Sequence, residues 1–269
     1  MVTRMKISVL MAVFNEEKFL NKTLTALTNQ SLKPNQIIIV DDGSTDRSPE
    51  IIREYPNASV KRLPVKKDKT IERYPFVLSI ASRLLSDDFD YAGILDADTL
   101  LEPDYYQKLV QRMAADKKIG IAGGELIGGR ASKPLGLMPY VYGANRLYSR
   151  RCWLKLNDGK VMKPIPQVDF YHNVYAEMLG FKTQRYSDIK SWHLRPTRLG
   201  NAFTKGYHAY KFGYYWYYLV LRSIRSKAPT MILGYLKAWA SGTPTYPIKS
   251  YVRYLQVYRL KKLITSMAS

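Results

Sequence analysis

The sequence predicts an α/β protein in which helices cover both faces of a mostly parallel sheet, with a helical, basic and aromatic extension at the C-terminus. In the first part of the chain, short apolar runs alternate with segments of helical periodicity, and the links between them are short. In the last part, tyrosines and basic residues become frequent. We therefore expect two domains, residues 1–199 and residues 200–269.

Composition limits the partners and the redox chemistry. The 269 residues include 42 Lys and Arg against 22 Asp and Glu, a net charge of +20, which favours an anionic partner such as nucleic acid, a membrane surface or a phosphorylated ligand. The single cysteine, Cys152, excludes an internal disulfide and a cysteine-based zinc site. The first residues lack the apolar core of a signal peptide, and no window suits a bilayer span, so we expect a cytoplasmic protein.

The first elements follow from apolar patterns. Residues 6–14 form a nearly continuous apolar run, typical of a strand covered on both faces. Apolar residues at spacings of three and four predict a helix through residues 19–27. Capping residue types at 44–48 precede an expected helix through Ile51 and Ile52. Further strands are expected at residues 36–40, 59–63 and 91–95.

Acidic residues follow three of these strands. Glu16 comes after the first strand, Asp41 and Asp42 come at the end of the second, and Asp96 and Asp98 follow the fourth. Parallel strands end at the same edge of a sheet, where such folds bind ligands, so we expect these acids to converge. Two carboxylates one residue apart can bind one hard cation, and that cation can hold a diphosphate. The structural alternative for the last pair is a strand end followed by a helix cap.

Two further features concern phosphate binding. No glycine-rich loop follows the first strand, which argues against a P-loop or a dinucleotide-dependent dehydrogenase. The basic cluster at residues 61–69 lies near the proposed edge, where it either helps to hold phosphate or forms a solvated loop.

Three motifs occur together at characteristic intervals: AVFNEE at residues 12–17, VDDGSTD at 40–46 and DAD at 96–98. Together they resemble glycosyltransferase family 2, whose members include dolichyl-phosphate mannose synthases. The resemblance covers about residues 5–195. It implies a GT-A fold, which is Rossmann-like, in residues 1–199, and transfer of a sugar from a UDP- or GDP-linked donor.

The resemblance also implies nucleotide contacts. Ala12, Phe14 and Glu16 match the segment that wraps the nucleoside, with Glu16 at the ribose. Asp41 and Asp42 match acids that contact the base and ribose region. Base recognition stays open, because the family's Gly-x-x-x-Ala-Arg-Asn segment has no counterpart here apart from one similar residue, Arg73.

The implied metal site uses Asp98 as a direct ligand, with Asp96 beside it contacting the nucleotide or the metal's water. His193 matches a metal-binding histidine of related enzymes, although a lone histidine is usually packed or solvated. Oxygen and nitrogen ligands together suit Mn²⁺ at least as well as Mg²⁺. Three basic residues could close over the diphosphate: Arg195, Arg198 and Lys205.

The second half contains the candidate base. A helix is expected at residues 103–113, a strand at 119–126, an acceptor-side loop at 128–139, a strand at 142–148 and another at 183–186. Asp169 starts a helical pattern that ends at Gly180, and such an Asp is most often a cap. The resemblance instead matches Asp169 to the general base of an inverting transfer, although Val168 replaces the family's glutamate. A phosphate acceptor would need this base much less.

The composition of the C-terminal extension suggests that it contacts a membrane surface. Its aromatic run at residues 212–221 is followed by Arg222, Arg225 and Lys227, a combination that suits the interfacial region of a bilayer. The alternative is a helical layer over the sheet. We expect peripheral contact with the inner face of the cell membrane and a lipid-linked or glycan acceptor. The Gln-x-x-Arg-Trp signature of processive synthases is missing, which favours transfer of a single sugar.

Three rival interpretations stay open. A nucleotidyltransferase on a similar fold would share the metal-binding acids without needing a base at Asp169. A nucleic-acid-binding protein would explain the charge and the tyrosines, but acids cluster where the sheet should bind and no RNA-binding motif is recognisable, so we expect no nucleic acid partner. A catalytically silent relative would keep the motifs without the activity.

Overall fold

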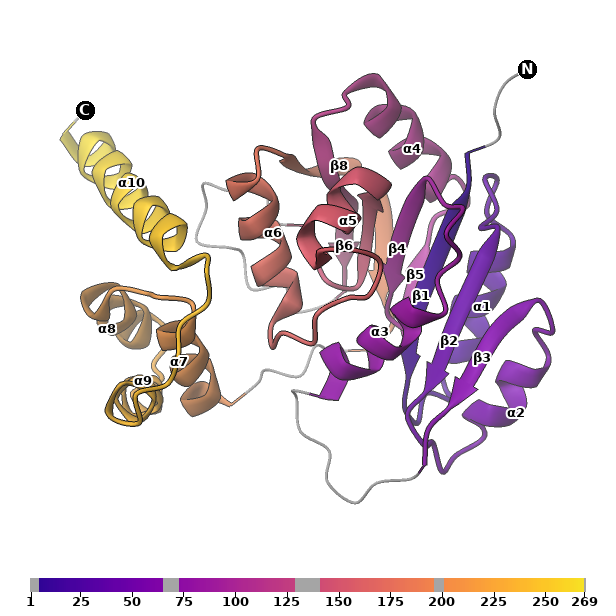
Figure 1. Ribbon diagram of the computed structural model, residues 1–269, viewed down its shortest axis with the longest axis horizontal. Coiled ribbons are helices and arrows are strands. Elements are labelled where there is room, and N and C mark those ends of the chain that lie inside the picture. The colour runs from indigo at the N-terminus through magenta and orange to yellow at the C-terminus, as the bar shows by residue number, and fades with distance from the viewer. Residues whose placement is uncertain (1–4, 65–72, 129–140, 196–200, 269) are drawn as a thin grey trace. The chain divides into compact units, whose positions relative to one another are not determined.

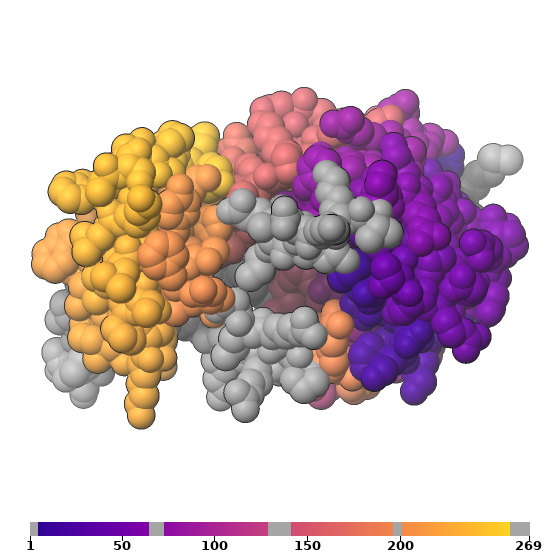
Figure 2. Space-filling model, turned by 90° about the horizontal axis from the view of Figure 1, so that it is seen from below, coloured from indigo at the N-terminus to yellow at the C-terminus, as the bar shows by residue number. Residues whose placement is uncertain are grey.

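The computed structural model describes residues 5–64, 73–128, 141–195 and 201–268, and side chains only as far as residue 258 (Figure 1, Figure 2). The chain divides into two compact units, Met1–Thr197 and Arg198–Ser269. The expected basic loop beyond residue 64, the expected acceptor-side loop beyond residue 128 and Arg198 lie outside the described residues.

The described residues of the first unit form an eight-stranded sheet with the order β3-β2-β1-β4-β7-β6-β8-β5. The strands β1, β2, β3 and β4 run parallel, as do β6 and β8, whereas the other pairs are antiparallel. The mostly parallel α/β fold is therefore confirmed. The strands are β1 (Ile7–Val13), β2 (Gln36–Asp41), β3 (Ala58–Arg62), β4 (Tyr91–Leu95), β5 (Thr99–Leu101), β6 (Ile119–Ile127), β7 (Asn145–Ser149) and β8 (Lys182–His193).

Helices cover both faces of this sheet (Figure 1). Alternate residues of β1 point to opposite faces, so Val9 packs in one apolar core and Leu10 in the other. The first core includes residues of α1 and α4, and the second includes residues of α3, α5 and α6. These helices are α1 (Leu20–Thr28), α2 (Ser48–Arg53), α3 (Arg73–Arg83), α4 (Tyr105–Ala115), α5 (Arg150–Asn157) and α6 (Val168–Met178).

Some elements differ from the sequence expectations. Three elements, β5, α3 and α5, were not expected from the sequence, and β8 is longer than the expected strand at 183–186. The short β5 has only three residues, too few to show a period. It exists because Thr99–Leu101 pairs with the end of β8, in the register Thr99↔His193. This pairing decides the geometry of the candidate site.

The second unit is helical. It contains α7 (Ala202–Lys211), α8 (Trp216–Arg225), α9 (Thr230–Ala240) and α10 (Lys249–Ala268). The helices α7 and α9 meet at two glycines: a Cβ on Gly206 would lie 1.7 Å from the carbonyl oxygen of Met231, and one on Gly234 would lie 1.9 Å from that of Phe203. Only glycine permits such a close approach of two backbones. Among the described helices, none combines the length and apolar character needed to cross a bilayer.

Candidate active site

The loops after β1 and β2 lock together at the edge of the sheet. Asn15 adopts a left-handed conformation with φ of 53°, which asparagine tolerates better than most residues. Its backbone N–H donates to Ser44 Oγ at 3.0 Å, and its side-chain oxygen accepts from the Thr45 N–H at 2.8 Å. The Glu16 N–H donates to Ser48 Oγ at 2.8 Å. These bonds fix Glu16 at the edge.

This locking changes the role expected for residues 44–48. The predicted helix is present as α2, but its N-cap is Arg47, which makes no side-chain capping bond. Asp46 Oδ1 accepts from the Ser48 N–H at 3.0 Å and so supports the helix start. The hydroxyls of Ser44 and Ser48 bind the other loop instead.

Asp41 and Asp42 are buried and each has an arginine partner. Asp41 Oδ1 accepts from the Ser44 N–H at 2.9 Å, and its Oδ2 lies 3.2 Å from Arg62 Nε. Both carboxylate oxygens of Asp42 accept from Arg73, at 2.5 Å for Nε to Oδ2. This fork geometry is a strong form of ion pair. Asp42 and Arg73 therefore form one paired unit beside the end of β2.

Ala12 and Phe14, the two other residues expected at the nucleoside, lie in β1 and directly after it. Ala12 is half-buried in β1 and pairs with Val40, so its side chain lies on the face covered by the second apolar core. Phe14 follows the last residue of β1 and is half-buried. Both residues therefore lie close to the strand end that carries Glu16.

The acid pair occupies a turn between β4 and β5. The Asp96 N–H donates to the Ala144 carbonyl at 3.0 Å, and the Asp98 carbonyl accepts from the Leu194 N–H at 2.8 Å. The alternative of a strand end followed by a helix cap is wrong, because α4 begins later, at Tyr105. Backbone bonds to two distant segments hold the turn in place.

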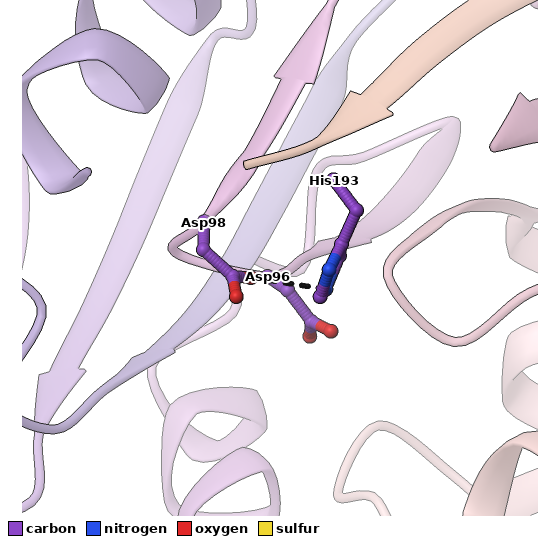
Figure 3. A group of neighbouring side chains, drawn as sticks. All are labelled: Asp96, Asp98 and His193. Atoms are coloured by element: carbon purple, nitrogen blue, oxygen red, sulfur yellow. Dashed lines mark ion pairs between the residues drawn. The ribbon is translucent and has the colours of Figure 1, made fainter. Parts of the chain in front are cut away.

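Asp96, Asp98 and His193 form a group that could hold a metal ion. One possible ligand atom from each residue lies within 4.8 Å of the other two, and Figure 3 shows the three side chains directed toward one space. His193 Nδ1 donates to the Arg195 carbonyl at 2.6 Å, and Nε2 lies 3.4 Å from Asp98 Oδ1. With Nδ1 bonded in this way, Nε2 is the ring nitrogen that faces the carboxylates, as in many histidine metal ligands. Two carboxylates and one imidazole fit a divalent cation such as Mn²⁺ or Mg²⁺.

Arg195 offsets part of the negative charge of this group. Its Nε lies 2.5 Å from Asp98 Oδ2, and its Nη2 donates to Glu16 Oε1 at 2.6 Å. Burial raises the pKa of Glu16, and the charge of Arg195 opposes that rise. The sequence suggested that Arg195 lies over a diphosphate, whereas here it lies on the acids themselves.

Tyr74 is a site residue that was not expected from the sequence. Its hydroxyl donates to Asp96 Oδ1 at 2.5 Å. Burial raises the pKa of Asp96, the bond from Tyr74 lowers it, and the charges of Asp98 and Asp169 raise it further. The one sequence signal was its position next to Arg73, the residue singled out in that segment.

Asp169 is the second residue of α6. The N-cap is Gln167, which makes no side-chain capping bond, so Asp169 does not hold the capping position considered from the sequence. A Cβ on Gly143 would lie 3.4 Å from Asp169 Cβ, which places the aspartate against the segment before β7. Since its charge acts on Asp96, the candidate base and the acid pair share one electrostatic environment.

A buried arginine supports this side of the site and was also missed. Arg146 is almost fully buried in β7, where it donates to the carbonyls of Val141 and Tyr142, at 2.9 and 3.0 Å, and to the Tyr148 hydroxyl at 3.0 Å. The same hydroxyl lies 2.9 Å from Nδ1 of His172, a residue of α6. This network ties the start of α6 to β7, and no periodicity predicts it.

Comparisons with known proteins agree with these observations. Residues 8–130 match the model of glycosyl transferase family 2. The chain is 32% identical over 115 residues to the glycosyltransferase GlyA of Streptococcus pneumoniae, covering 40% of this chain and 16% of that protein. It is 32% identical over 120 residues to the putative glycosyltransferase EpsH of Bacillus subtilis, covering 41% and 31%. The aligned part therefore spans less than a third of the length of either relative.

Solved structures show the same fold. A mannosyltransferase, PcManGT of Pyrobaculum calidifontis in complex with GDP-Man and Mn²⁺, has a TM-score of 0.58 at 16% identity and covers 96% of this chain and 81% of its own. Glucosyl-3-phosphoglycerate synthase of Mycobacterium tuberculosis has a TM-score of 0.56 at 18% identity, with 77% and 75% covered. These likenesses identify the fold as GT-A. Residues 8–130, just under half of the chain, are therefore similar to glycosyl transferase family 2.

Proposed function

We propose that this protein is an inverting, metal-dependent glycosyltransferase. It moves one sugar from a UDP- or GDP-linked donor to a lipid-linked acceptor at the cytoplasmic face of the cell membrane. The observation that carries the proposal is the group of Asp96, Asp98 and His193, at the edge where the parallel strands β1, β2 and β4 end. The family match includes both aspartates of this group.

Asp98 and His193 would hold Mn²⁺ or Mg²⁺, with Asp96 toward the nucleotide. Bound there, the cation neutralises the charge that builds on the leaving diphosphate. Arg195 must leave Asp98 for this, and its guanidinium is then available for a phosphate oxygen, as expected from the sequence. The same movement frees Glu16 to bind the ribose.

The nucleoside would lie along the ends of β1 and β2, against Ala12 and Phe14. Asp41 and Asp42 would contact the base and ribose region. Support comes from their burial and from the fixed positions that Arg62 and Arg73 give to the two carboxylates. A pre-positioned carboxylate binds a hydroxyl or amino group with little loss of side-chain entropy.

Asp169 would be the general base. In an inverting transfer, one carboxylate takes the proton of the acceptor hydroxyl as its oxygen attacks the anomeric carbon from the side opposite the diphosphate. The Asp169 carbonyl accepts from Asn173 Nδ2 at 2.6 Å and lies 3.4 Å from Arg146 Nη1, so the main chain that carries the base is held firmly. An acceptor that is already an anionic phosphate needs this proton transfer much less.

A thermal-shift panel tests the proposal. The full chain is heated with UDP, GDP, dTDP or CDP, with and without Mn²⁺, because a ligand of the folded state raises stability according to its occupancy. We expect at least one nucleotide to raise the Tm only with Mn²⁺, and Asp98→Asn to abolish that shift. The matched control is Asp88→Asn, an exposed acid paired with Lys6.

The products then identify the reaction. Release of a nucleoside diphosphate from the sugar donor supports a glycosyltransferase, whereas release of pyrophosphate would identify a nucleotidyltransferase. The absence of a metal-dependent shift with all four nucleotides would overturn the proposal.

A further inference from the structure

The outward face of α8 is apolar, which is the reverse of the usual arrangement for a helix in water. Leu221 and Ile224 are 57% and 69% exposed and, three residues apart, lie on one face of the helix. Trp216, the first residue of the helix, is 67% exposed. The buried residues of the helix are Leu219 and Ser223, which face away from Leu221. Two of the largest apolar side chains of this helix are therefore not used to pack the second unit.

The same reversal occurs on α9. Its exposed residues are large: Leu233, Leu236 and Trp239 are 58%, 48% and 64% exposed. Its buried residues are Met231, Gly234 and Ala238, and Gly234 lies against the backbone of α7. Leu233, Leu236 and Trp239 face outward instead, so the outer face is available to an apolar partner surface.

The charge of the second unit has one sign. Residues 198–269 contain no Asp or Glu, so the formal charge of this unit is +12, more than half of the +20 of the whole chain. Twelve basic residues supply it: Arg198, Lys205, Lys211, Arg222, Arg225, Lys227, Lys237, Lys249, Arg253, Arg259, Lys261 and Lys262. A partner must therefore offer negative charge together with an apolar surface.

These two requirements select among the possible partners. A second copy of the chain would bring two units of +12 together. Nucleic acid would satisfy the basic residues, and its bases could stack on tryptophan, but it would leave the aliphatic Ile224, Leu233 and Leu236 in water. An anionic bilayer satisfies both requirements, because its headgroups attract Lys and Arg and its interfacial region accepts tryptophan and aliphatic side chains.

A groove in the same unit adds a place for a headgroup. It has a volume of about 750 Å³ and is lined by Tyr215, Lys249, Arg253 and Tyr254, among others. The Arg253 guanidinium lies 4.8 Å from the centre of the Tyr215 ring, and its Nε donates to the Gly213 carbonyl at 3.1 Å. Tyr215 is also the N-cap of α8, so this basic and aromatic groove adjoins the start of the apolar helix.

We propose that the second unit binds an anionic lipid bilayer through the outward faces of α8 and α9. Trp216, Ile224, Leu233 and Trp239 enter the interfacial region, and the basic residues face the headgroups. This inference rests on the membrane contact of the proposed function and names the surface that makes it, independently of the transfer chemistry.

Vesicle binding by the full chain tests the surface. Vesicles of phosphatidylcholine alone and of phosphatidylcholine with an equal part of phosphatidylglycerol are floated with the protein, and the bound fraction is measured against lipid concentration. We expect at least about tenfold tighter binding to the anionic vesicles. Brominated lipid should quench the fluorescence of Trp216 and Trp239, and Trp216→Phe with Trp239→Phe should remove most of that quenching.

The decisive variant is Ile224→Ser with Leu233→Ser. Both side chains are exposed, so the fold should persist, and binding to anionic vesicles should fall at least about tenfold. The matched control, Val161→Ser with Met178→Ser, changes two exposed apolar residues of the first unit and should alter binding less than twofold. Circular dichroism checks that the helices remain.

Separate readouts distinguish this inference from the proposed function. If the Ile224→Ser, Leu233→Ser variant binds anionic vesicles as tightly as the wild type, the assignment of the surface is wrong. It is also wrong if the wild-type protein does not bind anionic vesicles. A third outcome is a wild-type protein that forms a dimer and does not bind vesicles, together with a double variant that is monomeric. This outcome would identify the faces as an interface between copies of the chain and would also overturn the inference. Vesicle binding that depends on these faces supports the inference even where no nucleotide shifts the Tm with Mn²⁺.

Discussion

In the first unit, charged side chains gather at one edge of the sheet and named partners hold them, whereas in the second unit large apolar side chains face outward with few partners. Asp42, Asp98 and Glu16 each pair with an arginine. Trp216 and Trp239, by contrast, remain largely exposed. A site for one small ligand needs fixed distances, whereas contact with a fluid surface needs only area and charge. Under the two proposals, the first unit meets the first demand and the second unit meets the other.

The largest effect is expected in the first unit, where partner residues hold the charged side chains in place. Replacing Asp169 by Asn should slow transfer to a hydroxyl acceptor by about 10³-fold, because general-base catalysis commonly contributes 10² to 10⁴. The Mn²⁺-dependent nucleotide shift should remain, because Asp169 is not among the candidate ligands. Steady-state kinetics measure the change, with the exposed Asp158→Asn as control. Near-normal turnover with a hydroxyl acceptor would rule out Asp169 as the base.

The inner faces of the second unit should tolerate substitution poorly. A Cβ on Gly234 would collide with the carbonyl of Phe203, so Gly234→Ala must separate α7 from α9. We expect a net loss of about 2 kcal/mol in the free energy of unfolding, even after the gain in helix propensity of about 1 kcal/mol. Urea unfolding measures it. The exposed Ala240→Ser on the same helix should change stability by less than about 0.5 kcal/mol, and an equal loss in both variants would refute the packing argument.

Replacement of Arg195 tests whether its ion pair with Asp98 competes with cation binding in the first unit. Because its guanidinium and a divalent cation compete for Asp98, Arg195→Gln should tighten Mn²⁺ binding in the absence of nucleotide by about tenfold. Electron paramagnetic resonance titration of free Mn²⁺ provides the measurement. The control is Arg112→Gln, which removes an arginine paired with Asp188. Unchanged or weaker Mn²⁺ binding would show that Arg195 does not occupy the cation's place.

The smallest effect concerns pH. Burial and, next, the charge of Arg146 lower the pKa of His172 to about 3. The unfolded chain, with an ordinary histidine pKa near 6.5, then binds more protons below that pH, so the free energy of unfolding falls as the pH drops from 6.5 toward 3. At pH 5.5 the loss should be about 1 kcal/mol. Chemical unfolding of wild type and His172→Gln should give parallel stabilities above pH 7 and a shallower decline for the variant below 6.5; identical slopes would contradict the assignment.

The sequence predicted the first half of the site because its signals are local. Apolar runs that end in acids, together with short links, require parallel strands with a common edge, and the structure places Glu16, Asp42 and Asp98 there. The two aspartates of the metal group were predicted from their spacing at a strand end, whereas His193 was anticipated through family resemblance. The roles of the individual residues stay predictions.

The rest depends on contacts between distant parts of the chain. Arg195 and Glu16 are 179 residues apart, and the pairing of Thr99 with His193 creates a strand of only three residues. The burial of Arg146 depends on carbonyls that β7 and the residues before it bring together. No local pattern encodes such contacts, since each depends on the completed sheet.

The glycine contact between α7 and α9 has a consequence for how such proteins diverge. Because Gly206 and Gly234 bring the helices together through their backbones, the fold of the second unit does not depend on the identity of the large side chains outside. Those outer positions can exchange apolar for polar residues one at a time while the helices keep their places. One catalytic domain could thus be adapted to different cellular surfaces by mutation of a few exposed residues alone.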